Sequence, residues 1–272
     1  MPSINTNVAA LFARNSLKVN ERAQSSAMQQ LSTGSRINSA SDDAAGLAIG
    51  QTMTAQVRGL NQAVRNLNDG INMMQTAEGA LVETSNMLQR MRELAVQSSN
   101  GTYSSDQRGY LQTEFAALST QIGKIATETN WNGTSLMAAT ATFTFQAGAV
   151  SGQTIAVTIN AMTTVTGLSI SAGEAVSTVT GASAAITALD IALKAVNSQR
   201  ATIGAGINQM TYGADNLSSI AANTTASRSS IMDTDYATAS TQLSKTQIIQ
   251  QAATAMLAQA NQQPQAVLSL LK

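Results

Sequence analysis

The sequence predicts a mainly α protein: a long antiparallel coiled-coil helix bundle formed by the N-terminal and C-terminal parts of the chain, with a small β-rich central insertion. Heptad spacing of apolar residues before residue 100 and again after residue 186 predicts the helices. Alternation with a period of two between residues 143 and 170 predicts the strands. Only 3% of the residues are aromatic, which suits thin bundles whose helices approach closely better than one thick core.

The first long helix is expected over residues 44–99, a length of roughly 80 Å at 1.5 Å per residue. Spacings of four and three alternate without a break from residue 53 to residue 95, as in a left-handed coiled coil. Ser41 or Asp42 is the expected N-cap, and Asn100 with Gly101 is the expected end. The seam of this helix includes Leu60, Val64, Leu67 and Ile71.

A shorter helix is expected over residues 111–125, and a second long one over residues 186–231, with Ile203, Ile207 and Leu217 in its seam. The two long helices are expected to pair antiparallel, with Ala44 beside Ile231. Glu78 and Arg200 both interrupt apolar seams, so we expect them to face each other as an ion pair that fixes the alignment. The alternative is that each side chain extends outward to solvent.

Short strands are expected at residues 143–145, 155–159 and 165–170, separated by glycines. The chain therefore divides into three expected domains. Residues 1–40 with 236–272 form a terminal coiled coil, residues 41–140 with 183–235 form a helical bundle, and residues 141–182 form the β-rich insertion.

The C-terminal region carries one charged side chain, Lys245, between residues 237 and 271. A helix on the surface of a globular protein normally carries charges opposite its apolar stripe. A membrane span would need about 18–20 unbroken apolar residues, and the glutamines here interrupt any such run. We therefore expect no membrane insertion but a helix buried among other protein chains, with heptad positions at Ile249, Ala252, Met256, Ala260, Val267 and Leu270.

Composition excludes several classes of function. The chain has no Cys and no His, which removes thiol chemistry, disulfides and His-based metal sites or catalytic dyads. The net charge of zero argues against nucleic acid, which requires a clustered basic surface. We expect no enzyme activity, no catalytic residue, no cofactor and no metal. Residues 1–22 lack the apolar segment of a secretory signal peptide.

Six segments resemble the terminal signatures of bacterial flagellin. They lie in the right order at the two ends of the chain, and the match covers roughly residues 1–140 and 185–272. The segments are SINTN (3–7), LSTGSRIN (31–38), DDAAGLAI (42–49), RELAVQ (92–97), AQANQQPQ (258–265) and VLSLL (267–271).

The resemblance implies a structural subunit of the flagellar filament, which polymerises into a hollow helical tube that acts as the propeller for swimming. In this family the two chain ends form a helical pair that lines the filament core, and the centre faces outward. The residues that we expect to assemble the core are Ile4, Val8, Leu11, Ile249, Met256, Val267 and Leu270.

The resemblance also implies partners. These are further copies of the chain, the flagellar cap and hook-associated proteins, the flagellar type III export apparatus, and an export chaperone that covers residues 249–271. Export would proceed without a cleaved signal peptide and place the protein in the extracellular filament. Positions that contact a host flagellin-sensing Toll-like receptor in this family match Arg90, Leu94 and Glu114. We expect packing between neighbouring subunits to be the primary role of that stretch.

Two other functions fit part of the pattern. A flagellar hook–filament junction protein shares the same terminal scheme, although residues 92–97 and 262–271 favour the filament subunit. A signalling coiled-coil module is the more distant alternative. Such a module should keep heptads through its middle and carry a membrane span, whereas this chain has expected strands at residues 143–170.

The terminal segments, residues 1–40 and 236–272, are expected to be disordered in the free subunit and to fold on assembly. Their small side chains bury too little to offset roughly 1–2 kcal/mol of backbone entropy per residue. Limited proteolysis should trim both ends of the free subunit quickly and leave them intact in filaments. Protease-resistant ends in the free subunit would contradict this expectation.

Overall fold

The structure is a computed structural model that describes residues 6–163, 168 and 175–269, with side chains up to Gln262 in the last helix. The mainly α class with a small strand-containing centre is confirmed. The third expected strand, at residues 165–170, lies outside the described residues apart from Leu168. The elements in chain order are α1 (Val8–Thr33), α2 (Ala44–Ser99), α3 (Ser105–Glu128), β1 (Asn130–Trp131), β2 (Thr134–Ser135), β3 (Ala141–Gln146), β4 (Thr154–Ile159), α4 (Val179–Met232) and α5 (Tyr236–Ser269).

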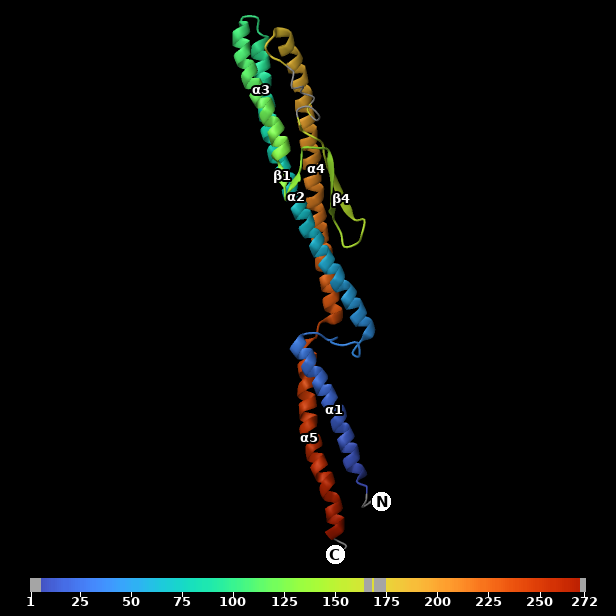
Figure 1. Cartoon of the computed structure of the whole chain (residues 1–272). Coiled ribbons are helices and arrows are strands. Elements are labelled where there is room, and N and C mark those ends of the chain that lie inside the picture. The colour runs from blue at the N-terminus through green and yellow to red at the C-terminus, as the bar shows by residue number, and fades with distance from the viewer. Residues whose placement is uncertain (1–5, 164–167, 169–174, 270–272) are drawn as a thin grey trace. The chain divides into compact units, whose positions relative to one another are not determined.

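The chain forms two compact units. Unit 1 comprises Met1–Val57 with Ala222–Lys272, and unit 2 comprises Arg58–Ala221. Both boundaries fall inside long helices, α2 and α4, so each of these helices contributes to both units. In unit 1, α1 and α5 lie side by side and antiparallel (Figure 1).

Two connections join the helices of unit 1. After α1, Gly34 adopts a positive φ of 70° that favours glycine, and its N–H donates to the carbonyl of Gln30. The next residues run antiparallel to the segment before α5, because Thr234 N–H donates to Gly34 O at 2.9 Å and Arg36 N–H to Met232 O at 2.7 Å. Ile37 is buried beneath this crossing. These two backbone hydrogen bonds therefore hold the two connections together.

The N-cap of α2 is Asp43, so the expectation of Ser41 or Asp42 is wrong. Asp43 Oδ1 accepts from the N–H of Gly46 at 2.9 Å, since α2 begins at Ala44. The carboxylate of Asp42 caps the preceding turn instead. It accepts from the N–H groups of Ser39 and Asn38, and these hydrogen bonds, that from Ser39 first, hold its pKa below the ordinary value.

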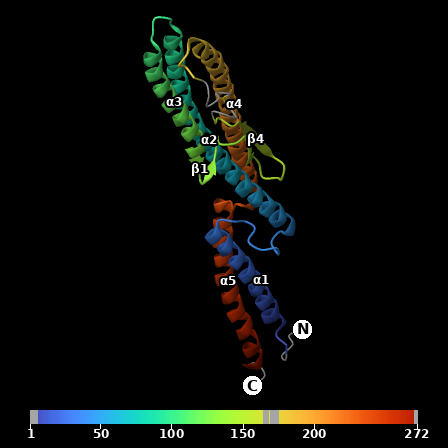
Figure 2. The ribbon, with the colours of Figure 1, turned by 45° about the horizontal axis from the view of Figure 1, so that its top comes forward.

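In unit 2, α2 lies between α3 and α4, and all three run side by side (Figures 1 and 2). Because α2 has neighbours on two sides, it buries a wider face than a two-stranded seam would. The residues of the expected seam lie in the hydrophobic core of unit 2. Leu60, Leu67, Ile203 and Leu217 are buried, and Val64, Ile71 and Ile207 are half-buried and pack against this core.

The register between α2 and α4 differs from the expected one. Gly50 lies against Met232, and Gly70 against Met210. The expected pairing of Ala44 with Ile231 is therefore displaced by about a turn and a half of helix. The heptad pattern repeats every seven residues, about two turns of helix, so it does not by itself distinguish registers that differ by about that much.

The β3–β4 hairpin packs on a row of glycines. Its strands pair antiparallel, with Phe143 opposite Val157 and Phe145 opposite Ile155. A Cβ atom added at Gly206 would lie 2.7 Å from Val157, and one at Gly70 would lie 2.9 Å from Phe145. These glycines lower the helix propensity of α2 and α4, and their missing side chains let the hairpin approach the helices.

The end of β4 is held by Gln199, which is 2% exposed on α4. Its amide donates to the carbonyl of Thr158 at 3.0 Å and accepts from the N–H of Asn160 at 3.2 Å. One side chain therefore satisfies two backbone groups on the outer edge of the strand, as a neighbouring strand would.

Among the described residues, α4 is the helix whose length and composition would allow a membrane crossing. It contains an 18-residue window of mean hydropathy 1.4. A single helix of this kind is weak support for a membrane span, because core helices of soluble proteins meet the same criterion. In unit 2, α4 buries Leu189 and Val196 in the bundle core and pairs Asp190 with Arg92.

Gln199→Leu should destabilise the protein by about 1–3 kcal/mol, because Thr158 O and Asn160 N–H lose their buried partner. Gln209→Leu is the matched control, since Gln209 is exposed on the same helix, and should change stability by less than about 0.5 kcal/mol. Chemical unfolding followed by circular dichroism measures both. Equal effects of the two substitutions would show that the amide does not hold the hairpin.

Candidate assembly and recognition surfaces

The terminal helix pair has a small and partly polar seam. Along it α1 and α5 contact each other directly. Asn20 is buried and donates from Nδ2 to Thr246 O at 2.7 Å, and Asn7 donates to Ala260 O at 2.7 Å. The seam positions of α5 that are buried or half-buried are Ala239, Leu243, Thr246, Gln250, Ala253, Leu257 and Ala260.

A second stripe of apolar side chains lies beside this seam and stays open to solvent. Phe12 is 70% exposed, Val19 51%, Ile249 40% and Met256 67%. Val19 and Ile249 line one groove of about 400 Å³ between the helices. Phe12 and Met256 lie one heptad from them, which places them along the same flank of the pair. We call these four residues the apolar face.

The opposite flank of the pair is mostly polar, with Leu11 and Met28 as exposed apolar side chains on it. On α1 it carries Arg14, Lys18 and Glu21, and on α5 it carries Ser244, Gln247 and Gln251, all exposed. Heptad geometry separates these positions from the apolar face by the seam itself. The terminal pair therefore has one apolar and one polar flank.

The other residues expected to assemble the core are placed as follows. Val8 and Leu11 are exposed on α1, outside the groove. Val267 is on α5, where its side chain is outside the described residues, and Ile4 and Leu270 also lie outside them. Of the expected C-terminal stripe, Ala260 faces α1, whereas Ile249 and Met256 face solvent.

The structure brings Glu78 and Arg200 together across the α2–α4 seam. Arg200 Nε donates to Glu78 Oε1 at 2.8 Å, and the side chain of Arg200 is 37% exposed and that of Glu78 31%. The second carboxylate oxygen, Oε2, is buried without a hydrogen-bond partner. The pair thus has the geometry of a polar seam contact; its role in fixing the register stays a prediction.

Charged side chains also link the three helices near the far end of α2. Arg90 contacts Glu114 on α3 at 2.9 Å and Glu93 at 3.0 Å, and these carboxylates, Glu114 first, raise the pKa of Arg90. Arg92 contacts Asp190 on α4 at 2.7 Å, and this hydrogen bond holds the pKa of Asp190 below its ordinary value.

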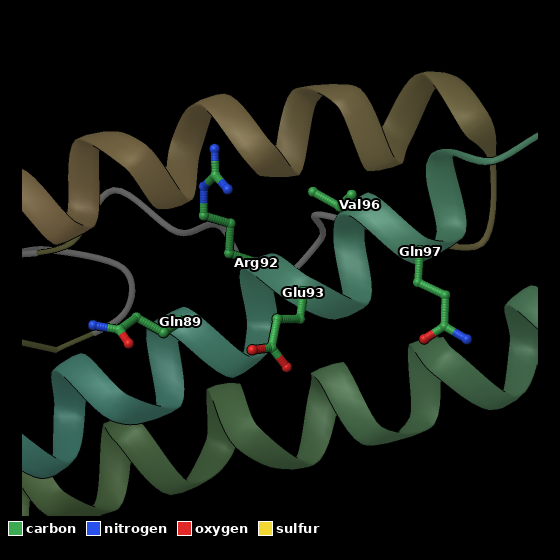
Figure 3. Close-up of a pocket in the computed structure, with 5 residues that line it drawn as sticks. All are labelled: Gln89, Arg92, Glu93, Val96 and Gln97. Carbon is green, nitrogen blue, oxygen red and sulfur yellow. The ribbon is translucent and has the colours of Figure 1, made fainter.

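A shallow surface groove of about 490 Å³ runs along this part of α2 (Figure 3). In Figure 3 Arg92 extends toward α4, while Glu93 and Gln97 extend toward α3. The exposed apolar side chain in this groove is Val96. Ion pairs on both sides of α2 therefore border a small apolar surface.

Leu94 does not belong to this surface. We expected it to act with Arg90 and Glu114 as an apolar anchor, but its side chain is 1% exposed in the bundle core. Leu94 is on the side of α2 that packs against its neighbours. Of the three expected contact residues, the structure therefore places only the ion pair of Arg90 and Glu114 at the surface.

Within the described residues, no group of three or more His, Cys, Asp or Glu side chains is arranged to hold a metal ion. The surfaces that stand out are those for packing against other proteins.

Comparison with known proteins identifies the family. Residues 4–142 match the bacterial flagellin N-terminal helical region, and residues 186–271 match the bacterial flagellin C-terminal helical region. The chain belongs to the bacterial flagellin family. It is a structural subunit of the flagellar filament rather than an enzyme, and it polymerises with copies of itself into that extracellular filament.

Relatives match along the whole chain. A flagellin from Halalkalibacterium halodurans is 44% identical over 270 residues, covering 99% of each chain. Flagellin B from Vibrio cholerae is 36% identical and the flagellar filament 33 kDa core protein from Treponema phagedenis 40% identical, again over 99% of each chain. Matches of this extent favour the filament subunit over a hook–filament junction protein.

Solved structures share the architecture. Bacillus cereus flagellin is 33% identical and superimposes with a TM-score of 0.50 over 56% of this chain and 88% of that chain. A putative flagellar hook-associated protein from Vibrio parahaemolyticus gives a TM-score of 0.59 over 71% of this chain and all (100%) of that chain. At 15% identity the latter shows the fold alone.

The Glu78–Arg200 pair should contribute more to stability than the Arg92–Asp190 pair. A double-mutant cycle with Glu78→Gln and Arg200→Gln should give a coupling free energy of about 1 kcal/mol or more, since the pair is partly desolvated. The exposed pair, measured with Arg92→Gln and Asp190→Asn, should give a clearly smaller coupling, because water screens it. Equal couplings in chemical unfolding would contradict a register role for Glu78 and Arg200.

Proposed function

We propose that the apolar face of the terminal helix pair is the surface through which subunits join in the filament core. The observation that carries the proposal is the concentration of exposed apolar side chains on one flank of a thin pair whose other flank is polar. A contiguous exposed apolar surface of this kind marks a site of association with another protein. Val8, together with Ile4, Val267 and Leu270, would extend the same contact along the helices, whereas Leu11, one heptad before Lys18, lies on the opposite flank.

The polymer requires two different contact surfaces on each subunit, because head-to-tail contact through unlike surfaces produces an open helical array. The terminal pair supplies one surface in the apolar face. Its polar flank would then face away from the subunit contact, toward the channel of the hollow filament. The side chains of α5 on that flank are neutral, whereas α1 carries Arg14, Lys18 and Glu21 there. The α5 side of the flank would therefore line the channel and hold no fixed charge against an unfolded chain that passes along the wall.

Three functional domains follow from this division of roles. Residues 1–40 with 236–272 would form the core, residues 41–140 with 183–235 the surrounding bundle, and residues 141–182 the outward insertion. The hairpin supports the last assignment, because it packs on the surface of α2 and α4 at Gly70 and Gly206.

Export would use the type III apparatus of the flagellum and no cleaved signal peptide. Before assembly, Ile249 and Met256 would leave an apolar stripe open to unwanted association. An export chaperone that covers residues 249–271 would protect it. The same terminal pairing would allow the subunit to join hook-associated proteins at the base of the filament and the cap at its tip.

Arg90 and Glu114 are the residues through which a host flagellin-sensing Toll-like receptor would contact the free subunit. Their exposed ion pair on adjacent helices offers a guanidinium and a carboxylate in fixed positions. Leu94 is not part of this proposal, and Val96 supplies the neighbouring exposed apolar side chain. Packing between subunits would remain the primary role of this stretch.

Ile249→Asp should raise the critical concentration for seeded polymerisation by at least about 100-fold, because it would bury an unpaired carboxylate at the subunit contact. Gln251→Asp is the matched control: it introduces the same charge on the same helix but on the polar flank, and it should change the critical concentration by less than about threefold. Sedimentation of filaments measures both. Normal polymerisation of the Ile249→Asp subunit would refute the proposed contact.

A further inference from the structure

Two methionines among the described residues are strongly exposed, and they lie on opposite flanks of the terminal pair. Met256 is 67% exposed on the apolar face, one heptad after Ile249. Met28 is 54% exposed on α1, two heptads after Arg14 and one after Glu21, and therefore on the polar flank. By contrast, Met74, Met91 and Met137 are fully buried in unit 2.

Exposure decides which thioethers meet an oxidant in water. A peroxide transfers one oxygen atom to the sulfur of methionine: the sulfur lone pair attacks, the O–O bond breaks, and the second oxygen leaves as water. The sulfur is oxidised by two electrons to the sulfoxide and the peroxide is reduced. The thioether loses no proton, so the reaction needs no neighbouring base. The product is a polar, chiral side chain in place of a flexible apolar one.

We infer that Met256 is an oxidation site through which peroxide controls entry of the subunit into the filament. The inference rests on the proposed role of the apolar face. A sulfoxide oxygen at this position requires a hydrogen-bond donor once it is removed from water. The side chains of Phe12, Val19 and Ile249 offer none. The groove has donors on Asn15, Ser16, Gln242 and Lys245. They surround Val19 and Ile249, one heptad from Met256, and Lys245 precedes Met256 by 11 residues, about 16 Å along the helix.

The consequence differs between the free and the assembled protein. In the free subunit Met256 is open to peroxide, and its oxidation removes that subunit from the pool able to polymerise. In the filament the same side chain is covered by the neighbouring copy, so finished filaments resist the oxidant. Oxidation of Met28, on the polar flank, leaves assembly unchanged because its sulfoxide stays in water.

The test uses the full chain, treated as free subunit with dilute hydrogen peroxide and analysed by peptide mass spectrometry and seeded polymerisation. Met28 and Met256 should gain oxygen before Met74 and Met91. The critical concentration of the treated subunit should rise at least about tenfold, as expected for a buried polar group without a partner. Methionine sulfoxide reductase should reverse the change.

Two leucine variants separate the sites. Met256→Leu should polymerise normally after peroxide treatment, whereas Met28→Leu should remain as sensitive as the unaltered chain. In assembled filaments Met256 should react at least about tenfold more slowly than in the free subunit, since the contact excludes solvent. Circular dichroism of the treated subunit should match that of the untreated one.

Three results would overturn the inference: normal polymerisation of subunits with fully oxidised Met256, equal peroxide sensitivity of Met256→Leu, or equal oxidation rates in subunit and filament. The proposed role of the apolar face is tested separately. If Ile249→Asp blocks assembly while oxidised Met256 does not, only the oxidation site is refuted. If Ile249→Asp assembles normally, the apolar face itself is refuted.

Discussion

The antiparallel pairing of N-terminal with C-terminal helices is the constraint on which the other features depend. In unit 1 it joins α1 to α5, and in unit 2 it sets α4 against α2. Because the partners come from opposite ends of the sequence, each chain segment between them must start and end at the paired helices. Two such segments are α3 and the β3–β4 hairpin. The Arg90–Glu114 pair links α3 to α2, and Gln199 links the hairpin to α4.

The two pairings are built differently, and the difference fits their roles in a filament. The seam of unit 2 contains large side chains and one polar interruption, Glu78 with Arg200. The seam of unit 1 combines alanines with a few half-buried leucines such as Leu243 and Leu257, and Asn20 and Thr246 are buried in it. Small and polar seams hold helices close but bury little apolar surface, so much of the apolar surface of the terminal helices lies outside the seam. Ile249 and Met256 are therefore exposed, as the proposed contact between subunits requires.

The heptad pattern is visible in the sequence because each long helix packs along its whole length, and it correctly predicted α2 at residues 44–99. The alternation with a period of two correctly predicted the hairpin strands near residues 143 and 157. Local capping was less predictable. Asp42 and Asp43 are chemically equivalent candidates, and only the position of the first helical turn makes Asp43 the cap. The sequence also did not predict the roles of Gln199 and of the glycines that contact the hairpin, because these roles depend on contacts between segments distant in sequence.

The sequence by itself determined that this chain forms long paired helices with a short β-rich centre. Periodicity and composition are local properties, so the order of residues specifies them. Only the tertiary structure decided which stripe of each helix faces its own chain. On α5, two heptad stripes are offset by one residue. The stripe that contains Thr246 faces α1, whereas Ile249 and Met256, in the other stripe, are exposed to solvent. On α2, packing on two sides buries Leu94 and leaves Val96 exposed. The choice between stripes depends on where the partner helix lies, which is a property of the folded chain and not of any one segment.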